Sequence, residues 1–212
     1  ELMQWIATEN NVSETAFVLL DSNPLEIRWF SPTIEVDLCG HATLATARIL
    51  FDEYLPATET TIIFRYKGGL IEARTEGDLI YLDFPNDEPE IFKNISILNN
   101  ILQVKPDSFY KGRDDYLAIY ADADLVLNAN PSVANLKKLN ARGLIISAPG
   151  RDTDIISRCF YPRIGVNEDP VTGSAHTLLT PYWSKKLGKL KLTAHQASGR
   201  GGYLECESKG DR

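Results

Sequence analysis

Residues 28–47 read RWFSPTIEVDLCGHATLATA, and much of this stretch returns at residues 158–179 as RCFYPRIGVNEDPVTGSAHTLL. Arg, Phe, Pro, Ile and Val recur in the same order, beginning at Arg28 and Arg158, an offset of 130 residues (158 − 28). After a three-residue insertion, Cys39-Gly40 aligns with Thr172-Gly173 at an offset of 133 (173 − 40). The same offset relates KGGLIEA at 67–73 to RGGYLEC at 200–206. We interpret these blocks as an internal duplication of roughly half the chain.

Composition limits the class of protein. The chain has 212 residues, enough for one large domain or two small ones, and its 43% hydrophobic and 24% charged residues are ordinary for a globular protein. A net charge of −7 disfavours a nucleic-acid partner. No apolar run approaches the roughly 20 residues that cross a bilayer, so no membrane span is expected. Three widely spaced cysteines indicate a reducing compartment, and we expect a cytoplasmic protein.

Short runs rich in β-branched and aromatic residues dominate both halves. They are bounded by Gly, Pro, Asn and Asp, which is typical of strands. The predicted strands lie at residues 16–20, 26–30, 60–66, 69–75 and 79–85 in the first half, and at 116–121, 143–149, 154–162, 189–197 and 202–208 in the second.

Each half also contains one prominent predicted helix, at 40–54 and at 173–188. The first is apolar nearly all round, so it should be buried on every side. Pro181 should kink or shorten the second helix. Residues 88–115 indicate a further helix with a polar connection, and 130–143 a surface helix with Asn130 as N-cap.

These elements predict an α/β (α+β) fold of two pseudo-symmetric lobes. Each lobe should be a curled, mostly antiparallel sheet around a central helix. We place the lobes at residues 1–110 and 111–212.

The two strand-to-helix turns are candidate ligand sites. A helix N-terminus presents unpaired N–H groups and a positive dipole end, which suit a carboxylate, and small residues such as Gly40, Gly173 and Ser174 allow close approach. These glycines would also be explained as tight turns, but a matched pair favours a site. Two lobes usually face each other across a cleft, so we expect both helices to point their N-termini at one cleft.

Cys39 immediately precedes the first helix, where the pKa of a thiol tends to fall. Two opposed thiols could serve as base and acid in a cofactor-free racemase. The residue aligned with Cys39 is Thr172, whose hydroxyl is too weak an acid or base, so the two-thiol mechanism is disfavoured. A buried structural role for Cys39 is the alternative.

His41 is a stronger candidate than Cys39 for proton transfer, because imidazole can both accept and donate a proton near neutral pH. A structural histidine at a helix end explains it equally well. Asp169 fits a capping or turn role as well as a catalytic one, and Glu14 would pass for a surface residue. No His-x-x-x-His or paired-Cys spacing occurs, so we expect no metal site.

Four motifs together resemble the PhzF-like (phenazine-biosynthesis-like) family. The resemblance implies a diaminopimelate-epimerase fold, which agrees with the duplication. The motifs are ENNVSETAFV at 9–18, the 28–47 stretch, GVNEDPVTGSAHTLLTPYW at 165–183 and ASGRGGYLECE at 197–207.

By this resemblance the chain is a cofactor-independent isomerase that moves a proton within a small carboxylate-bearing metabolite. Glu14 matches the residue that shuttles the proton, while His41 and Asp169 line the pocket. The Gly173-Ser174 turn matches the carboxylate-binding segment, and a homodimer is implied. Cys39, Gly40 and Thr172 complete the expected substrate-binding set.

Proton transfer near neutral pH predicts a raised pKa for Glu14 through burial. It also predicts that the side chains of Glu14 and Asp169 lie within roughly 10 Å of each other. A non-catalytic metabolite-binding protein is the main alternative, and an amino-acid racemase or epimerase using Cys39 is a weaker one.

The chain departs from the family pattern at both ends. Relatives begin with an additional strand and a GNP-containing loop, and they end with a further strand after the position of GDR (residues 210–212). We therefore expect that the first part of the first lobe and the last strand of the second are missing.

Overall fold

The computed structural model describes residues 1–212 as two compact units, Glu1–Phe84 and Pro85–Arg212. The sequence places this boundary near residue 110 instead. Residues 85–110 join the second unit because strand β7 (Glu90–Ile91) pairs with β8 (Ser108–Lys111) in the second sheet.

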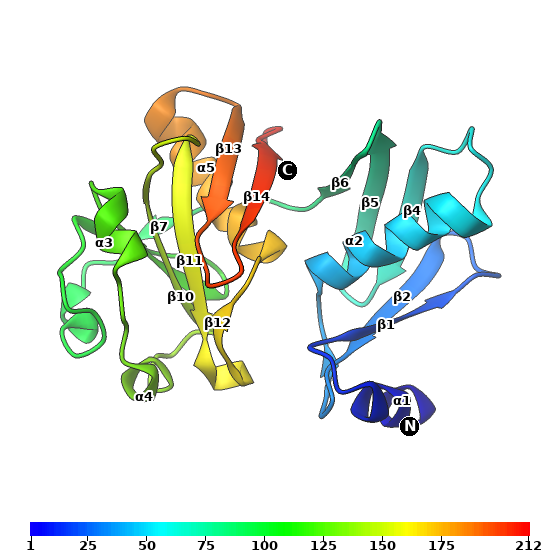
Figure 1. Ribbon diagram of the computed structural model, residues 1–212, viewed down its shortest axis with the longest axis horizontal. Helices are drawn as coiled ribbons and strands as arrows, with labels where there is room; N and C mark the ends of the chain where they lie inside the picture. The colour runs from blue at the N-terminus through cyan, green and yellow to red at the C-terminus, as the bar shows by residue number, and fades with distance from the viewer. The chain divides into compact units, whose positions relative to one another are not determined.

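The first unit contains a six-stranded sheet in the order β1-β2-β4-β5-β6, with β3 paired to β2 (Figure 1). All pairs are antiparallel except β2 with β4, which are parallel. The strands are β1 (Thr15–Leu19), β2 (Leu25–Phe30), β3 (Glu35–Val36), β4 (Thr61–Tyr66), β5 (Gly69–Glu76) and β6 (Leu79–Asp83).

The second unit contains an eight-stranded sheet in the order β14-β13-β11-β10-β9-β8-β7, with β12 paired to β11. The pairs β11/β13 and β9/β10 are parallel and the others antiparallel. Its remaining strands are β9 (Asp115–Ile119), β10 (Gly143–Pro149), β11 (Ile155–Tyr161), β12 (Val166–Asp169), β13 (Lys191–Gln196) and β14 (Gly202–Glu207).

Five strands of each sheet share one topology, which agrees with the duplication. The order β1-β2-β4-β5 in the first unit is matched by β10-β11-β13-β14 in the second, and each short strand, β3 or β12, pairs with the equivalent neighbour. The parallel pair occurs at the same place in both, at β2/β4 and at β11/β13. Parallel neighbours need a crossover connection, and in each copy that connection carries the long helix.

Helix α2 (Gly40–Ile49) crosses the first sheet and contacts both β1 and β6, the two ends of the sheet order. The sheet therefore curls around the helix, as predicted. One expectation was wrong, because α2 is not buried on every side. Leu44 and Ile49 are 40% and 55% exposed, so the sheet covers only part of the apolar circumference. The chain continues into a π-helical turn, η1 (Leu50–Tyr54).

Helix α5 (Gly173–Leu187) is the counterpart in the second unit and contacts β9, β13 and β14. Most of its residues are buried, including Leu178, Leu179 and Trp183. Pro181 lies inside the helix without shortening it, and Gly188 ends it in the left-handed conformation, with φ 66°.

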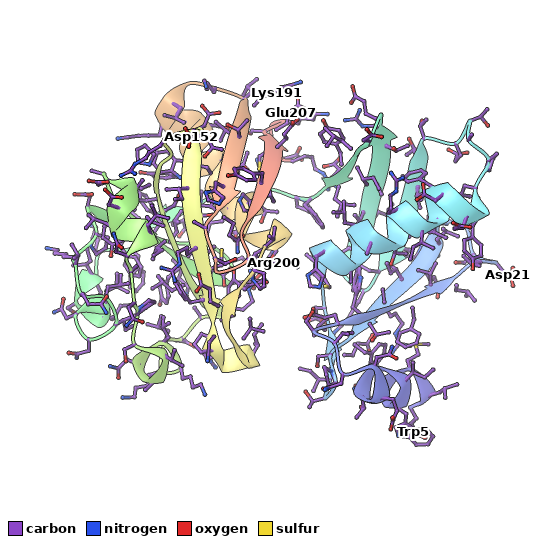
Figure 2. The ribbon with its side chains drawn as sticks, in the orientation of Figure 1. Trp5, Asp21, Asp152, Lys191, Arg200 and Glu207 are labelled. Atoms are coloured by element: carbon purple, nitrogen blue, oxygen red, sulfur yellow. The ribbon has the colours of Figure 1, made fainter.

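The predicted helices outside the duplicated core were largely wrong. Residues 88–115 form β7, a 3₁₀ turn η2 (Ile95–Leu98) and β8 instead of a helix. The surface helix predicted at 130–143 is reduced to α4 (Val133–Leu136), whose N-cap is Ser132. Elements outside the predictions are α1 (Leu2–Asn10), α3 (Ala123–Leu127) and the 3₁₀ turn η3 (Pro162–Ile164). On α1, Trp5 points away from the sheet and is 64% exposed (Figure 2).

Hydrophobic side chains fill both units. One cluster lies between the first sheet and α2, and it includes Trp29 and Phe64. In the second unit, separate clusters occupy the α5 face of the sheet and the face covered by α3 and α4. No helix is long and apolar enough to span a membrane.

Candidate functional site

The first unit brings three of the predicted site residues together. Glu14 directly precedes β1, Cys39 is the N-cap of α2, and His41 lies in the first turn of that helix. His41 Nε2 lies 3.2 Å from Glu14 Oε2, and Cys39 Sγ lies 3.7 Å from His41 Nδ1. Ser13 Oγ is 3.4 Å from the same Nε2 atom. Glu14, Cys39 and His41 therefore form one polar cluster at the start of the helix.

Local structure explains why these groups meet. Cys39 has extended backbone angles (φ −138°, ψ 103°), as an N-cap residue requires. Its carbonyl accepts hydrogen bonds from the amide of Thr43 at 3.1 Å and from the Thr43 hydroxyl at 2.7 Å. Thr43 is fully buried, so the first turn of α2 is fixed, and His41 is held beside Glu14, just before the start of β1.

The electrostatics of this cluster overturn the expectation that the pKa of Glu14 is raised. Burial acts to raise the pKa of Glu14, but the adjacent His41 outweighs it and holds the pKa below the usual value for a glutamate. Contacts with Cys39 and Glu14 raise the pKa of His41 to about 10. The resting pair is therefore a carboxylate beside an imidazolium, a base next to an acid.

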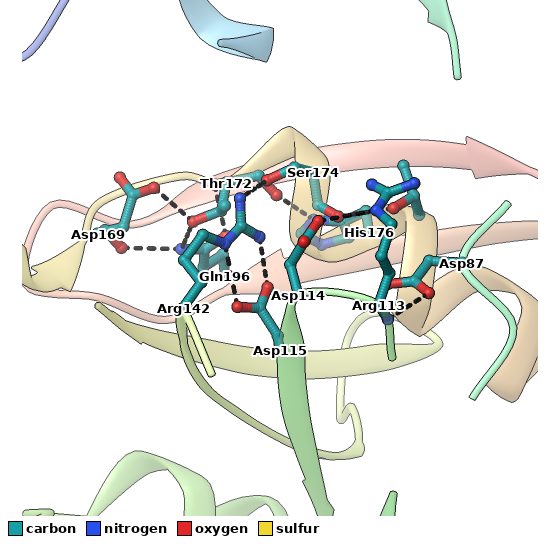
Figure 3. Close-up of polar contacts among 11 residues, drawn as sticks. Asp87, Arg113, Asp114, Asp115, Arg142, Asp169, Thr172, Ser174, His176 and Gln196 are labelled. Carbon is teal, nitrogen blue, oxygen red and sulfur yellow. Dashed lines mark hydrogen bonds and ion pairs between the residues drawn. The ribbon is translucent and has the colours of Figure 1, made fainter. Parts of the chain in front are cut away.

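In the second unit the helix start is built from a buried polar network (Figure 3). Thr172, the N-cap of α5, donates its hydroxyl proton to Asp169 Oδ2 at 2.6 Å. The fully buried Gln196 accepts the Thr172 amide proton at 2.7 Å and donates to the Asp169 carbonyl at 2.8 Å. Asp169 thus has the structural role of positioning this turn, whatever further role it has.

Sequence reasoning missed two residues at this turn. Arg142 donates to Ser174 Oγ at 3.0 Å, and its Nε donates to Asp115 Oδ1 at 3.0 Å, with a second contact between Nη2 and Oδ2. Asp115 is 3% exposed, and the guanidinium carbon stands 4.8 Å above the ring of Tyr161. No motif contains Arg142 or Asp115. Asp115 begins β9 and Arg142 directly precedes the neighbouring strand β10, so only the pairing of these strands brings the two residues together across 27 positions of sequence.

His176 was not assigned a role from sequence. Its Nδ1 lies 2.8 Å from the carbonyl of Thr172, and its side chain is buried. Burial lowers the pKa of this imidazole, so it is neutral at physiological pH and Nδ1–H donates to the carbonyl.

The predicted site residues thus form two groups. Glu14, Cys39, Gly40 and His41 lie together in the first unit, and Asp169, Thr172, Gly173 and Ser174 in the second. Both helices begin at the predicted glycines, so both expose the amide groups that suit a carboxylate. The expected approach of Asp169 to Glu14 stays a prediction.

A solved structure identifies the type of fold. A protein of Pseudomonas aeruginosa described as a predicted epimerase shares this architecture, with a TM-score of 0.68 at 19% identity over 96% of this chain and 79% of that one. The fold is therefore of the diaminopimelate-epimerase type.

The family can also be named. The family described as phenazine biosynthesis-like protein (PhzC-PhzF) matches residues 1–212, and the chain belongs to it. A PhzF-family crystal structure from Enterococcus faecalis aligns with a TM-score of 0.93 at 42% identity, covering 99% of this chain and 80% of that one. An uncharacterised isomerase of P. aeruginosa is 44% identical over 212 residues, which are 100% of this chain and 81% of the relative.

Proposed function

We propose that the chain is a cofactor-independent isomerase that moves a proton within a small carboxylate-bearing metabolite. The observation that carries the proposal is the pairing of Glu14 with His41, 3.2 Å apart at the start of α2. Family membership and relatives named as isomerases support the reaction class.

In the proposed reaction Glu14 removes a proton from one carbon of the substrate and returns it to another. Because its pKa is held low beside His41, Glu14 begins as the base. The imidazolium of His41 donates a hydrogen bond to the negative charge that develops on the substrate. We propose that Asp169 takes part in the same proton transfer from the second unit.

The substrate carboxylate is proposed to bind at the glycine turns, with Gly40, Gly173 and Ser174 as the principal contacts and Cys39 and Thr172 beside them. Unpaired amide groups at a helix start favour an anion, and this preference does not depend on the rest of the substrate. The proposed substrate is therefore a carboxylic acid, and these contacts do not specify its other chemical groups.

The proposal is tested by screening carboxylate metabolites by NMR in heavy water. An isomerase that shuttles a proton incorporates solvent deuterium at one carbon, whereas a non-catalytic binding protein perturbs ligand signals without incorporation. Racemisation of an amino acid that is lost in Cys39→Ser would instead favour the racemase alternative.

Once a substrate is found, Glu14→Gln should lower its turnover on the order of 10²–10⁴-fold, because the amide cannot accept the proton. Glu9→Gln, at an exposed position on α1, is the matched control and should leave turnover unchanged. Full activity in Glu14→Gln with an unchanged circular dichroism spectrum would contradict the assignment.

We further propose a cytoplasmic homodimer. Size-exclusion chromatography with light scattering tests the dimer, since a monomeric mass at micromolar concentration would refute it.

A further inference from the structure

The cluster at the start of α2 combines three chemically different metal ligands. Glu14, Cys39 and His41 supply a carboxylate oxygen, a sulfur and an imidazole nitrogen, and one ligand atom from each lies within 4.8 Å of the other two. The sequence spacing predicts no metal site at these residues, because Glu14 and Cys39 are brought together only by the fold.

The distances suit a tetrahedral ion. With Zn–S near ~2.3 Å and Zn–N and Zn–O near ~2.0–2.2 Å, tetrahedral ligand atoms stand about 3.3–3.7 Å apart. His41 Nε2 lies 3.2 Å from Glu14 Oε2 and 3.8 Å from Cys39 Sγ. The ligand atoms of Glu14 and Cys39 lie within 4.8 Å of each other, and a bound ion would draw them closer together.

The ligand types select the ion. Thiolate and imidazole favour Zn²⁺ and its neighbours over Mg²⁺ and Ca²⁺, which prefer oxygen. A helix N-terminus opposes a lone cation, but a thiolate and a carboxylate offset the charge of a divalent ion, and the ion displaces the protons of the thiol and of the imidazolium as it binds. The side chain of His41 is 48% exposed and that of Glu14 is 19% exposed, whereas Cys39 is buried, so an ion would enter from the side of His41.

The second half of the molecule provides an internal comparison. The positions aligned with Cys39 and His41 are Thr172 and Ser174, which have hydroxyl groups instead of a thiol and an imidazole. The Thr172 hydroxyl already donates to Asp169, and the Ser174 hydroxyl accepts from Arg142. The duplicated turn therefore lacks the ligand set, and one ion per chain is expected.

We propose that Glu14, Cys39 and His41 form a three-ligand site for Zn²⁺, with a fourth position open to water or another small ligand. A bound ion would occupy the atoms that Glu14 and His41 need for proton transfer, so micromolar Zn²⁺ would inhibit the enzyme reversibly. This inhibition rests on the proposed function, but the binding itself does not.

Binding is measured with the full chain by isothermal titration with Zn²⁺ and by visible absorption with Co²⁺. The expected result is one ion per chain and a sulfur-to-cobalt charge-transfer band that Zn²⁺ abolishes, since Zn²⁺ binds more tightly than Co²⁺ at such sites. Cys39→Ser should remove the band. Each of Cys39→Ser, His41→Gln and Glu14→Gln should weaken Zn²⁺ binding more than about tenfold, because loss of even an outer-shell partner costs 10–100-fold.

Matched controls are Cys206→Ser, His195→Gln and Glu9→Gln, which change the same residue types elsewhere and should leave binding unchanged. Circular dichroism establishes that each variant is folded. The proposal is overturned by an absence of saturable binding, by binding that survives all three site substitutions, or by a cobalt complex without the sulfur band. An inactive protein that binds Zn²⁺ at Cys39 would refute the proposed function alone, and an active one that binds none would refute this site alone.

Discussion

The two halves of the chain contain the same ion pair in different surroundings. Arg28 forms two parallel hydrogen bonds to Glu35, at 2.8 and 2.7 Å, and both side chains are nearly half exposed. Arg158 forms the same pair with Glu168, at 2.7 and 2.9 Å, with side chains only 14% and 25% exposed. Arg158 also donates to three backbone carbonyls at the end of α3, those of Val126, Leu127 and Ala129. The two ion pairs have the same geometry but should contribute differently to the free energy of unfolding, because burial removes the competition from water.

The starts of α2 and α5 also differ in how their polar side chains are bonded. In the first half the hydroxyl of Thr43 bonds to the N-cap carbonyl, and Cys39 and His41 are left beside Glu14. In the second half the imidazole of His176 bonds to that carbonyl, and the N-cap hydroxyl is engaged by other side chains. The first copy thus places titratable side chains at its helix start, whereas the second copy places a hydrogen-bonded structural network there.

The largest expected difference in the free energy of unfolding is between substitutions of Arg158 and Arg28. Arg158→Ala leaves Glu168 largely buried without its partner and should lower the free energy of unfolding by about 3–5 kcal/mol. Arg28→Ala removes an exposed pair and should cost about 0–1 kcal/mol. Urea denaturation followed by circular dichroism measures both, and equal losses would break the comparison.

Gln196→Leu should have the next largest effect on the free energy of unfolding. The substitution leaves the buried amide of Thr172 and the carbonyl of Asp169 without their partner, at a cost of about 2–3 kcal/mol. Gln4→Leu, which removes one partly buried bond to the Ser31 carbonyl in the first half, is the control and should cost about 1 kcal/mol or less. Thermal unfolding of the two variants side by side provides the measurement, and a loss at Gln196 no greater than at Gln4 would contradict the framework role.

Acid should destabilise the second half through His176. Burial lowers the pKa of His176 in the folded state, so the unfolded chain binds more protons as the pH falls through the ordinary histidine pKa of about 6.5. The stabilising contribution is complete above that pH and is lost as the pH falls further, by at most about 1.4 kcal/mol per pH unit. His176→Gln should remove this component from urea unfolding curves recorded between pH 7.5 and 5.5. Unchanged pH dependence in the variant would show that other groups cause it.

A small effect on stability is expected for Thr43, the counterpart of His176 in the first half. Thr43→Val removes the hydroxyl bond to the Cys39 carbonyl but leaves the amide bond to the same atom, so the cost should be about 0.5–1.5 kcal/mol. This loss should be independent of pH between 5.5 and 7.5. Urea denaturation at pH 5.5 and at pH 7.5 measures both the size of the loss and its independence of pH.

Much of the duplicated core could be predicted from the sequence. Offsets of 130 and 133 residues located both long helices and their starting glycines, because the strand-turn-helix pattern is local and repeated. The cluster of Glu14 and His41 was also predicted, although through the family motif rather than through physical reasoning about the chain.

Other features could not be predicted, because tertiary contacts decide them. The apolar pattern of α2 does not reveal that Leu44 and Ile49 face solvent. The pairing of Arg142 with Asp115 depends on the parallel neighbours β9 and β10, a contact that no local pattern encodes. The pKa of Glu14 was predicted in the wrong direction because its partner was not weighed against burial.

The parallel strand pairs have a consequence for folding kinetics. Leu25 pairs with Phe64 in the first half, and Ile155 pairs with Ala194 in the second, a sequence separation of 39 residues in both (64 − 25 and 194 − 155). Loop-closure entropy depends on this separation, so the step that joins the central strands carries the same entropic cost in each half. Neither half is favoured by topology to fold first. The crossover helices are also alike in length, because α2 and η1 together span 15 residues (10 + 5) and α5 spans 15, so helix length does not set the order either.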